Sequence, residues 1–182
     1  MAKKLLVLCM AAIMAVAALV AGCGGDQKAA SDNKVLKVGT NADFAPFEFQ
    51  DENGKEYQGF DMDLIRAIGE EMGYKVEISN IQFDGLIPAI QAGNIDVAIT
   101  GMTINEERKQ NVLFSDPYYK SGLSIIVAKD NNDIKTFQDL KGKKVAVQIG
   151  TTSAAEVNKI GGVEVKEFNS SADTFMELRA KG

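Results

Sequence analysis

One arginine stands where its charge needs an explanation. An apolar run ends in Gly101-Met102-Thr103 and a helix is expected to begin at Asn105, so Arg108 falls in the first helical turn. A cation there opposes the helix macrodipole, which costs roughly 0.3–1 kcal/mol at an exposed site. Either Glu106 and Glu107 neutralise the guanidinium, or an anion binds to it. A guanidinium offers two parallel donors to a carboxylate, and a helix N-terminus adds free amides.

A second anion-binding loop is expected further along the chain. Gly150-Thr151-Thr152-Ser153 follows a predicted strand, Lys144–Gln148, and opens a helix. Small hydroxyl residues are favoured at any helix N-cap, so this pattern alone is a weak signal. Its backbone amides nevertheless suit a carboxylate.

Residue types that are missing exclude several kinds of chemistry. The 182 residues include no histidine and only two cysteines, Cys9 and Cys23. The common nucleophile–base pairs and the common zinc sites are therefore excluded. Carboxylate or lysine chemistry stays possible, but no motif marks it, and we predict no catalytic residue, no metal site and no cofactor.

Alternating strands and helices must position these residues. Helices are expected at 85–92, at 172–180 and from Phe60 to Gly73. In the last of these, we assign the apolar stripe Phe60, Leu64, Ile68 and Met72 to the core. Asp61 and Asp63 are assigned to helix capping and to interaction with the helix dipole. The expected strands are Val35–Val38, Lys75–Ser79, Ile95–Thr100, Leu123–Ala128, Lys144–Gln148 and Val163–Phe168. This order favours parallel βαβ pairing, with ligands at the carboxyl ends of strands.

The N-terminus indicates export. Lys3 and Lys4 precede an uncharged run that ends in Val20-Ala21-Gly22-Cys23, as in a secretory signal peptide. The run resembles a bacterial lipobox, in which Cys23 becomes the lipidated N-terminus; an uncleaved membrane anchor of about 20 residues is the alternative. Removal of two of the 20 basic residues leaves 18 against 25 acidic ones, a net charge of −7. Such an acidic chain is not expected to bind nucleic acid.

Several motifs together resemble one family. The chain is similar to the polar amino-acid-binding lipoproteins of bacterial ABC importers, the family 3 solute-binding proteins, in particular glutamine-binding proteins. The motifs are TNADFAPFEF (40–49), GFDMDLIRAI (59–68), FDGLIPAIQAGNIDVAITGMTINEERK (83–109), FSDPYYKSG (114–122) and LKGKKVAVQIGTTS (140–153). The resemblance implies an α/β, periplasmic-binding-protein-like fold of two lobes joined by a hinge.

The resemblance also divides the chain. We expect a signal peptide at 1–22, a flexible tether at 23–34, a first lobe at 35–117, a hinge crossing at 118–122 and a partial second lobe at 123–182. The pattern of Val76–Gly93 recurs weakly at Val163–Gly182, but no strand follows the second copy. We therefore expect the second lobe and its return crossing to be incomplete, with the partner for the ligand ammonium beyond Gly182.

In this family, the arginine at the position of Arg108 binds the ligand α-carboxylate, helped by groups matching Gly101 and Thr103. Thr151 and Thr152 are expected to reach the same carboxylate from the second lobe. By the same resemblance, Phe44 and Phe83 would sandwich the ligand side chain, which Asn41 and Gln148 would face, whereas Phe47 and Phe49 are assigned to the core. The predicted ligand-binding residues are thus Asn41, Phe44, Phe83, Gly101, Thr103, Arg108, Gln148, Thr151 and Thr152.

The function that the resemblance implies is capture of a free amino acid by cleft closure. The ligand would then pass to an ABC permease with its ATPase subunits, and the protein would be a monomer held by its lipid on the outer face of the cytoplasmic membrane. Asn41 and Gln148 are both amides, which can donate and accept, whereas glutamine-binding relatives tend to have an acid and a lysine at these positions, so the ligand stays open. A neutral polar amino acid is expected first, with glutamine ahead of cystine or a basic amino acid. The alternatives are a cyclohexadienyl or arogenate dehydratase-like enzyme on the same fold, and a sensory surface lipoprotein that does not transport.

Overall fold

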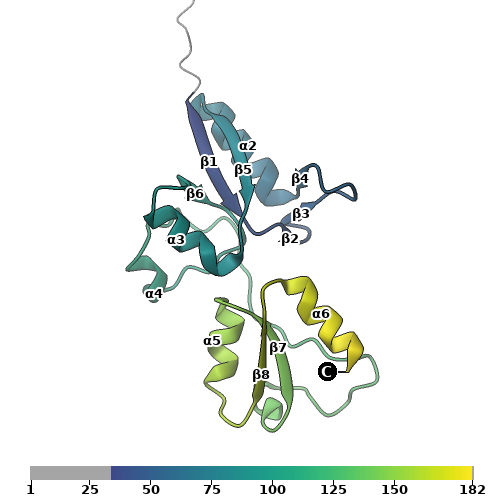
Figure 1. The fold of residues 1–182 in the computed structure, drawn as a ribbon. Coiled ribbons are helices and arrows are strands. Elements are labelled where there is room, and N and C mark those ends of the chain that lie inside the picture. Colours follow the sequence, from purple (N-terminus) through teal and green to yellow (C-terminus); the bar gives the residue numbers. More distant parts are fainter. Residues whose placement is uncertain (1–33, 182) are drawn as a thin grey trace, which may run out of the picture. The chain divides into compact units, whose positions relative to one another are not determined.

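The computed structural model describes residues 34–181 (Figure 1). The predicted signal peptide, the lipidation site Cys23 and all of the tether except Lys34 lie outside these residues. Within the described range, no helix is both long enough and apolar enough to cross a membrane.

The first sheet has three parallel strands. β1 (Val35–Thr40) lies between β5 (Lys75–Asn80) and β6 (Val97–Ala98), with Val38 opposite both Ile78 and Val97. This confirms the parallel pairing that the strand–helix alternation predicts, although the predicted strand Ile95–Thr100 is reduced to the two residues of β6. The buried residues of the core against this sheet are Val38, Met62, Ile65 and Ile99.

Helix α2 (Phe60–Met72) ends as predicted at Gly73, but it buries a different face from the one expected. Phe60, Ile68 and Met72 are exposed, and the buried positions are Asp61, Met62, Ile65 and Gly69. The buried face lies one position along the chain from the predicted stripe, of which only Leu64 packs against the core. Asp61 and Asp63 lie in the first turn of α2, as the dipole role requires, but no side chain caps this helix, and Asp61 is buried.

Between β1 and α2, a small antiparallel sheet joins β2 (Asp43–Phe44), β3 (Glu48–Gln50) and β4 (Tyr57–Gln58). Phe47 and Phe49, assigned to the core from sequence, are only half-buried. Phe47 instead packs among aromatic rings, with its centroid 6.0 Å from that of Phe44 and 4.8 Å from that of Tyr119. The prediction that these two residues are core is wrong because this sheet is too small to be covered on both faces.

The remaining elements after β6 are mostly short. η1 (Phe83–Gly85) leads into α3 (Leu86–Gln91), close to the predicted helix, and α4 (Glu106–Lys109) is a single turn. The predicted strand Leu123–Ala128 does not form, because no strand among residues 34–181 pairs with it. Alternating Leu, Ile and Val residues favour an extended chain, but a strand exists only where a neighbour completes its hydrogen bonds.

A second parallel pair has its own hydrophobic cluster. β7 (Lys144–Gln148) pairs with β8 (Glu164–Phe168), and both α5 (Thr152–Asn158) and α6 (Ser171–Ala180) contact β7 (Figure 1). η2 (Phe137–Leu140) precedes β7. The buried residues of this cluster are Leu140, Val147, Ala154 and Val157. The strands and helices predicted in this part are confirmed within two residues at each end.

Candidate functional site

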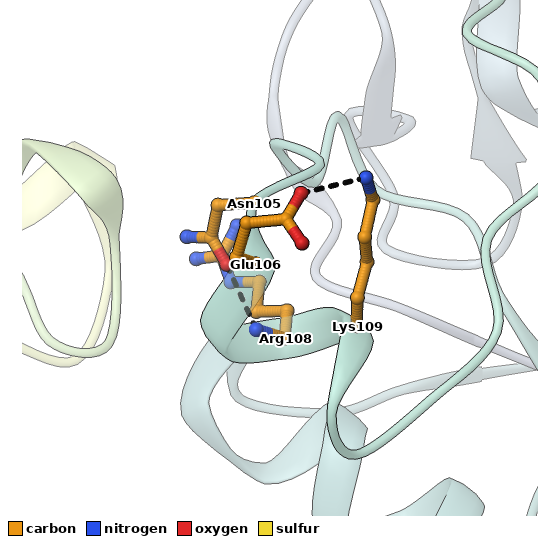
Figure 2. Close-up of polar contacts among 4 residues, drawn as sticks. All are labelled: Asn105, Glu106, Arg108 and Lys109. Atoms are coloured by element: carbon orange, nitrogen blue, oxygen red, sulfur yellow. Dashed lines mark hydrogen bonds and ion pairs between the residues drawn. The ribbon is translucent and has the colours of Figure 1, made fainter.

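The backbone of α4 answers part of the question raised by Arg108. Asn105 caps the helix, and its side-chain oxygen accepts the Arg108 N–H at 2.8 Å (Figure 2). Glu106 forms its ion pair with Lys109 at 2.8 Å, not with Arg108. No ion pair among residues 34–181 includes Arg108. Neither Glu106 nor Glu107 therefore forms a direct ion pair with the guanidinium; burial lowers the pKa of Arg108, and the charge of Glu107 opposes that effect.

The Arg108 guanidinium joins two loops. Its Nη1 donates to the Thr103 carbonyl at 2.7 Å, and its Nη2 donates to the Gly150 carbonyl at 3.0 Å. Its central carbon lies 5.4 Å from the centre of the Phe83 ring. The residue is 8% exposed, and this burial lowers its pKa, yet arginine remains protonated in proteins. A guanidinium has five N–H donors, so these two bonds leave donors free for an anionic ligand.

The loop before α5 carries the second set of predicted residues. Thr151 is the N-cap: its Oγ1 accepts the Ala154 N–H at 3.2 Å and donates to the Gln148 carbonyl at 2.7 Å. The hydroxyls of Thr152 and Thr103 are 3.2 Å apart. The loop before α5 therefore lies close to the residues around Arg108. It brings the Thr152 hydroxyl and the backbone amides at the start of α5 close to Thr103.

Gly150 permits this approach. Its φ is +74°, and a Cβ there would stand 2.9 Å from the Cβ of Asp84. Only glycine tolerates both the left-handed backbone and the contact at this position.

The two predicted amides meet directly. Gln148 Nε2 donates to Asn41 Oδ1 at 2.7 Å and to the Asn169 carbonyl at 3.1 Å. Asn41 directly follows β1 and Gln148 ends β7, so both stand at carboxyl ends of parallel strands, as the fold type predicts. Between them they keep donor and acceptor groups available for a polar side chain.

Eight of the nine predicted residues line one open cavity; Arg108 is not among the lining residues. Phe44 is an exposed ring on this lining, close to the α-carbon of Gly101, whereas Phe83 lies beside the guanidinium. This lining is extensive, so the direct contacts are more specific: they join Arg108 to Thr103 and Phe83, Thr103 to Thr152, and Asn41 to Gln148. The roles of these residues toward a ligand stay predictions.

Residues 36–179 match the family model described as "Bacterial extracellular solute-binding proteins, family 3". The chain belongs to this family. The chain is 34% identical over 182 residues to the arginine-binding extracellular protein ArtP of Bacillus subtilis. The aligned region covers 98% of this chain and 69% of that protein. It is also similar to the solved structure of an ancestral arginine-binding protein bound to arginine, with 53% identity, a TM-score of 0.79, and coverage of 81% of this chain and 66% of that one.

A structure of the ancestral arginine-binding protein bound to glutamine matches equally well, with 53% identity, a TM-score of 0.78, and coverage of 81% and 65% of the two chains. These likenesses confirm the predicted α/β periplasmic-binding-protein fold over the shared part. The chain spans about two thirds of the length of these relatives. The relatives carry the names of amino-acid-binding proteins, which agrees with the prediction that this family 3 chain is not an enzyme.

Sequence reasoning missed several polar residues of this family 3 chain. Ser171 donates its N–H to Asp43 Oδ2 at 3.0 Å and its hydroxyl to the Asp43 carbonyl at 2.9 Å, a pairing across 128 positions that no local pattern signals. Thr100, Glu48 and Asp61 form a buried group behind Gly101. Of these residues, only the burial of Asp61 could have been predicted from sequence, because Asp61 shares the helical face of Ile65 and Gly69.

Proposed function

We propose that this chain captures a polar L-amino acid and presents it to an ABC permease with its ATPase subunits. One observation carries the proposal: Arg108 is a buried guanidinium that forms no ion pair with any of residues 34–181, and its side chain connects the loops at 103 and 150. A carboxylate bound there would satisfy the free guanidinium donors and use the amides at the start of α5.

The ligand side chain is proposed to face Asn41 and Gln148, with Phe44 and Phe83 covering its carbon stem. Two neutral amides favour glutamine, because an amide both donates and accepts hydrogen bonds. The names of the relatives add arginine as a second candidate, since the ancestral arginine-binding protein has been solved with either amino acid. A side chain ending in an amide or a guanidinium suits this pair of residues.

The proposal also includes the location of the protein and its attachment to the membrane. The family description is of extracellular proteins, and the sequence Val20-Ala21-Gly22-Cys23 supports a lipid anchor at Cys23 on the outer face of the membrane. A monomeric receptor of this kind would close about residues 118–122, the predicted hinge. A Cys23→Ser variant should then be released from the membrane fraction, whereas a Cys9→Ser variant should remain attached.

Thermal unfolding with and without amino acids tests the binding proposal. The purified chain is heated with L-glutamine, L-arginine and the remaining amino acids, and with the α-carboxamides of glutamine and arginine as matched analogues. Ligand at about 1,000 times its dissociation constant stabilises a protein by about 4 kcal/mol, which raises the melting temperature of a chain this size by several degrees. We expect a selective shift that the carboxamides do not produce. A folded protein that responds to no amino acid, or equally to the carboxamides, would overturn the proposal.

A further inference from the structure

Two acidic side chains, Glu48 and Asp61, are buried beside Thr100 and Gly101. Glu48 of β3 is 1% exposed and Asp61 of α2 is 0% exposed. Neither takes part in any of the ion pairs found within residues 34–181. Two buried carboxylates without a cation would be strongly unfavourable, so their charge must be reduced in another way.

Their hydrogen bonds show which oxygens are satisfied. Glu48 Oε1 accepts the Thr100 hydroxyl at 3.0 Å. Asp61 Oδ2 accepts the Gly101 N–H at 3.0 Å and the Tyr118 hydroxyl at 2.8 Å. The other two oxygens, Glu48 Oε2 and Asp61 Oδ1, are buried without any donor from the described residues. The two carboxyls are bonded to adjacent residues, Thr100 and Gly101, which brings them close to each other, and the charge of Asp61 acts on Glu48. Two acceptor oxygens can bond only if one of them carries a proton.

We propose that Glu48 and Asp61 share one buried proton, with Glu48 as the acid and Asp61 as the carboxylate, and that the pair positions Gly101 and Tyr118 beside the ligand site. The hydrogen bonds support this placement of the proton, because Asp61 Oδ2 accepts two donors, Gly101 N–H and the Tyr118 hydroxyl, whereas Glu48 accepts only the Thr100 hydroxyl among the described residues. Glu48 then donates to Asp61, and every buried oxygen of the pair has a partner. Both residues are positioning residues, because their hydrogen bonds run to Thr100, Gly101 and Tyr118; Glu48 also belongs to the cavity lining.

The surroundings of the pair favour the same proton placement. Burial, followed by the charge of Asp61, raises the pKa of Glu48 to about 9; Asp43 adds to the rise and the Thr100 hydroxyl opposes it. Burial and the bond to Asp61 also raise the pKa of Tyr118, which keeps that phenol a donor. The titratable groups that face Glu48 are therefore Asp61 from α2, Asp43 from β2 and Tyr118 from the predicted hinge, with no cation among them.

The pair connects two parts of the proposed site. Thr100, which donates to Glu48, accepts the backbone N–H of Asn41 at 3.0 Å. Gly101, held by Asp61, begins the loop that leads to Thr103, and Tyr118 begins the predicted hinge. The effect on ligand binding rests on the proposed function, whereas the shared proton itself does not.

The pH dependence of stability without any amino acid tests the shared proton. A raised pKa means that Glu48 stabilises the fold fully below its unfolded pKa near 4.5, and that this contribution is lost as the pH rises to about 9. Glu48→Gln keeps a neutral donor to Asp61 and does not titrate. The melting temperature of the wild-type chain should therefore fall between pH 5 and pH 9 relative to that of Glu48→Gln. Asp63→Asn is the matched control, because Asp63 is an exposed acid of the helix that carries Asp61. The melting temperature of this variant should change with pH in parallel with that of the wild type.

Infrared spectroscopy gives a second readout that needs no variant to fold. At pH 7 the exposed carboxylates are ionised, so the wild-type protein should show one carbonyl band of a protonated carboxylic acid. Where Glu48→Gln folds, it should lack that band. Absence of the band in the folded wild type at pH 7, or parallel melting profiles for wild type and Glu48→Gln, would overturn the proposal. Neither readout involves an amino acid, so a failure here is distinct from a failure of the binding proposal.

Discussion

Arg108 and Gly150 are hydrogen-bonded through Nη2 and a backbone carbonyl at 3.0 Å, across 42 positions of the chain. The same guanidinium holds the Thr103 carbonyl through Nη1 at 2.7 Å. One side chain therefore orders the two loops between which we place the ligand carboxylate, and it still has donors to offer.

Replacing Arg108 by lysine tests this double role. Lysine keeps the charge but has no planar fork, so it cannot hold two carbonyls and a carboxylate together. We expect Arg108→Lys to weaken amino-acid binding by about 2–5 kcal/mol, measured by calorimetry, as for the loss of a buried charged partner. Lys109→Ala is the control, because that side chain is exposed and pairs only with Glu106, and it should bind as the wild type does. Equal affinities for Arg108→Lys and wild type would remove Arg108 from the carboxylate site.

The amide pair should set the preference for the ligand side chain. Gln148→Glu places a negative charge beside Asn41, which should favour arginine over glutamine by about 1–4 kcal/mol, the interaction of two charges about 4 Å apart between water and an effective dielectric of about 20. Competition of the two amino acids in the same calorimeter measures the ratio. Gln138→Glu makes the same charge change at an exposed position outside the cavity lining and should leave the ratio unaltered. An unchanged ratio in Gln148→Glu would place the ligand side chain elsewhere.

Asp43 and Ser171 should be energetically coupled. Their three hydrogen bonds join β2 to the first residue of α6. A double-mutant cycle with Asp43→Ala and Ser171→Ala should give a coupling of about 0.5–3 kcal/mol in the free energy of unfolding. The cycle of Asp43→Ala with Ser153→Ala, on α5, is the comparison and should be additive. Additivity in the first cycle would show that the contact contributes nothing in solution.

Two methionines of α2 test which face of that helix is buried. Met62 is 0% exposed and Met72 is 58% exposed, so the same truncation to alanine should have different effects. We expect Met62→Ala to cost about 2–5 kcal/mol in chemical unfolding, from lost burial and a cavity. Met72→Ala should stay within about 0.5 kcal/mol of wild type. Similar losses in both variants would favour the stripe predicted from sequence.

Local chemistry made part of the fold predictable from sequence. At Asn105 and Thr151, a side chain of one residue accepts a free backbone N–H at the start of a helix. At Gly73, the absence of a side chain permits the left-handed backbone that ends α2. Parallel pairing followed from the order of strands and helices, since a parallel crossover requires a helix between strands. The strand at Leu123–Ala128 was wrong because a strand also needs a partner, which a local pattern does not contain.

The sequence by itself determined the family, most of the strand–helix order and the contacts of Arg108 with the loops that carry Thr103 and Thr151. The tertiary structure alone decided that Glu106 pairs with Lys109 and not with Arg108, that Asp43 meets Ser171, and that Glu48 and Asp61 are bonded to the adjacent residues Thr100 and Gly101. The physical reason is distance along the chain. Residue type and periodicity describe neighbours within a few positions, whereas burial of a carboxyl and the partners of a guanidinium depend on segments brought together only by folding.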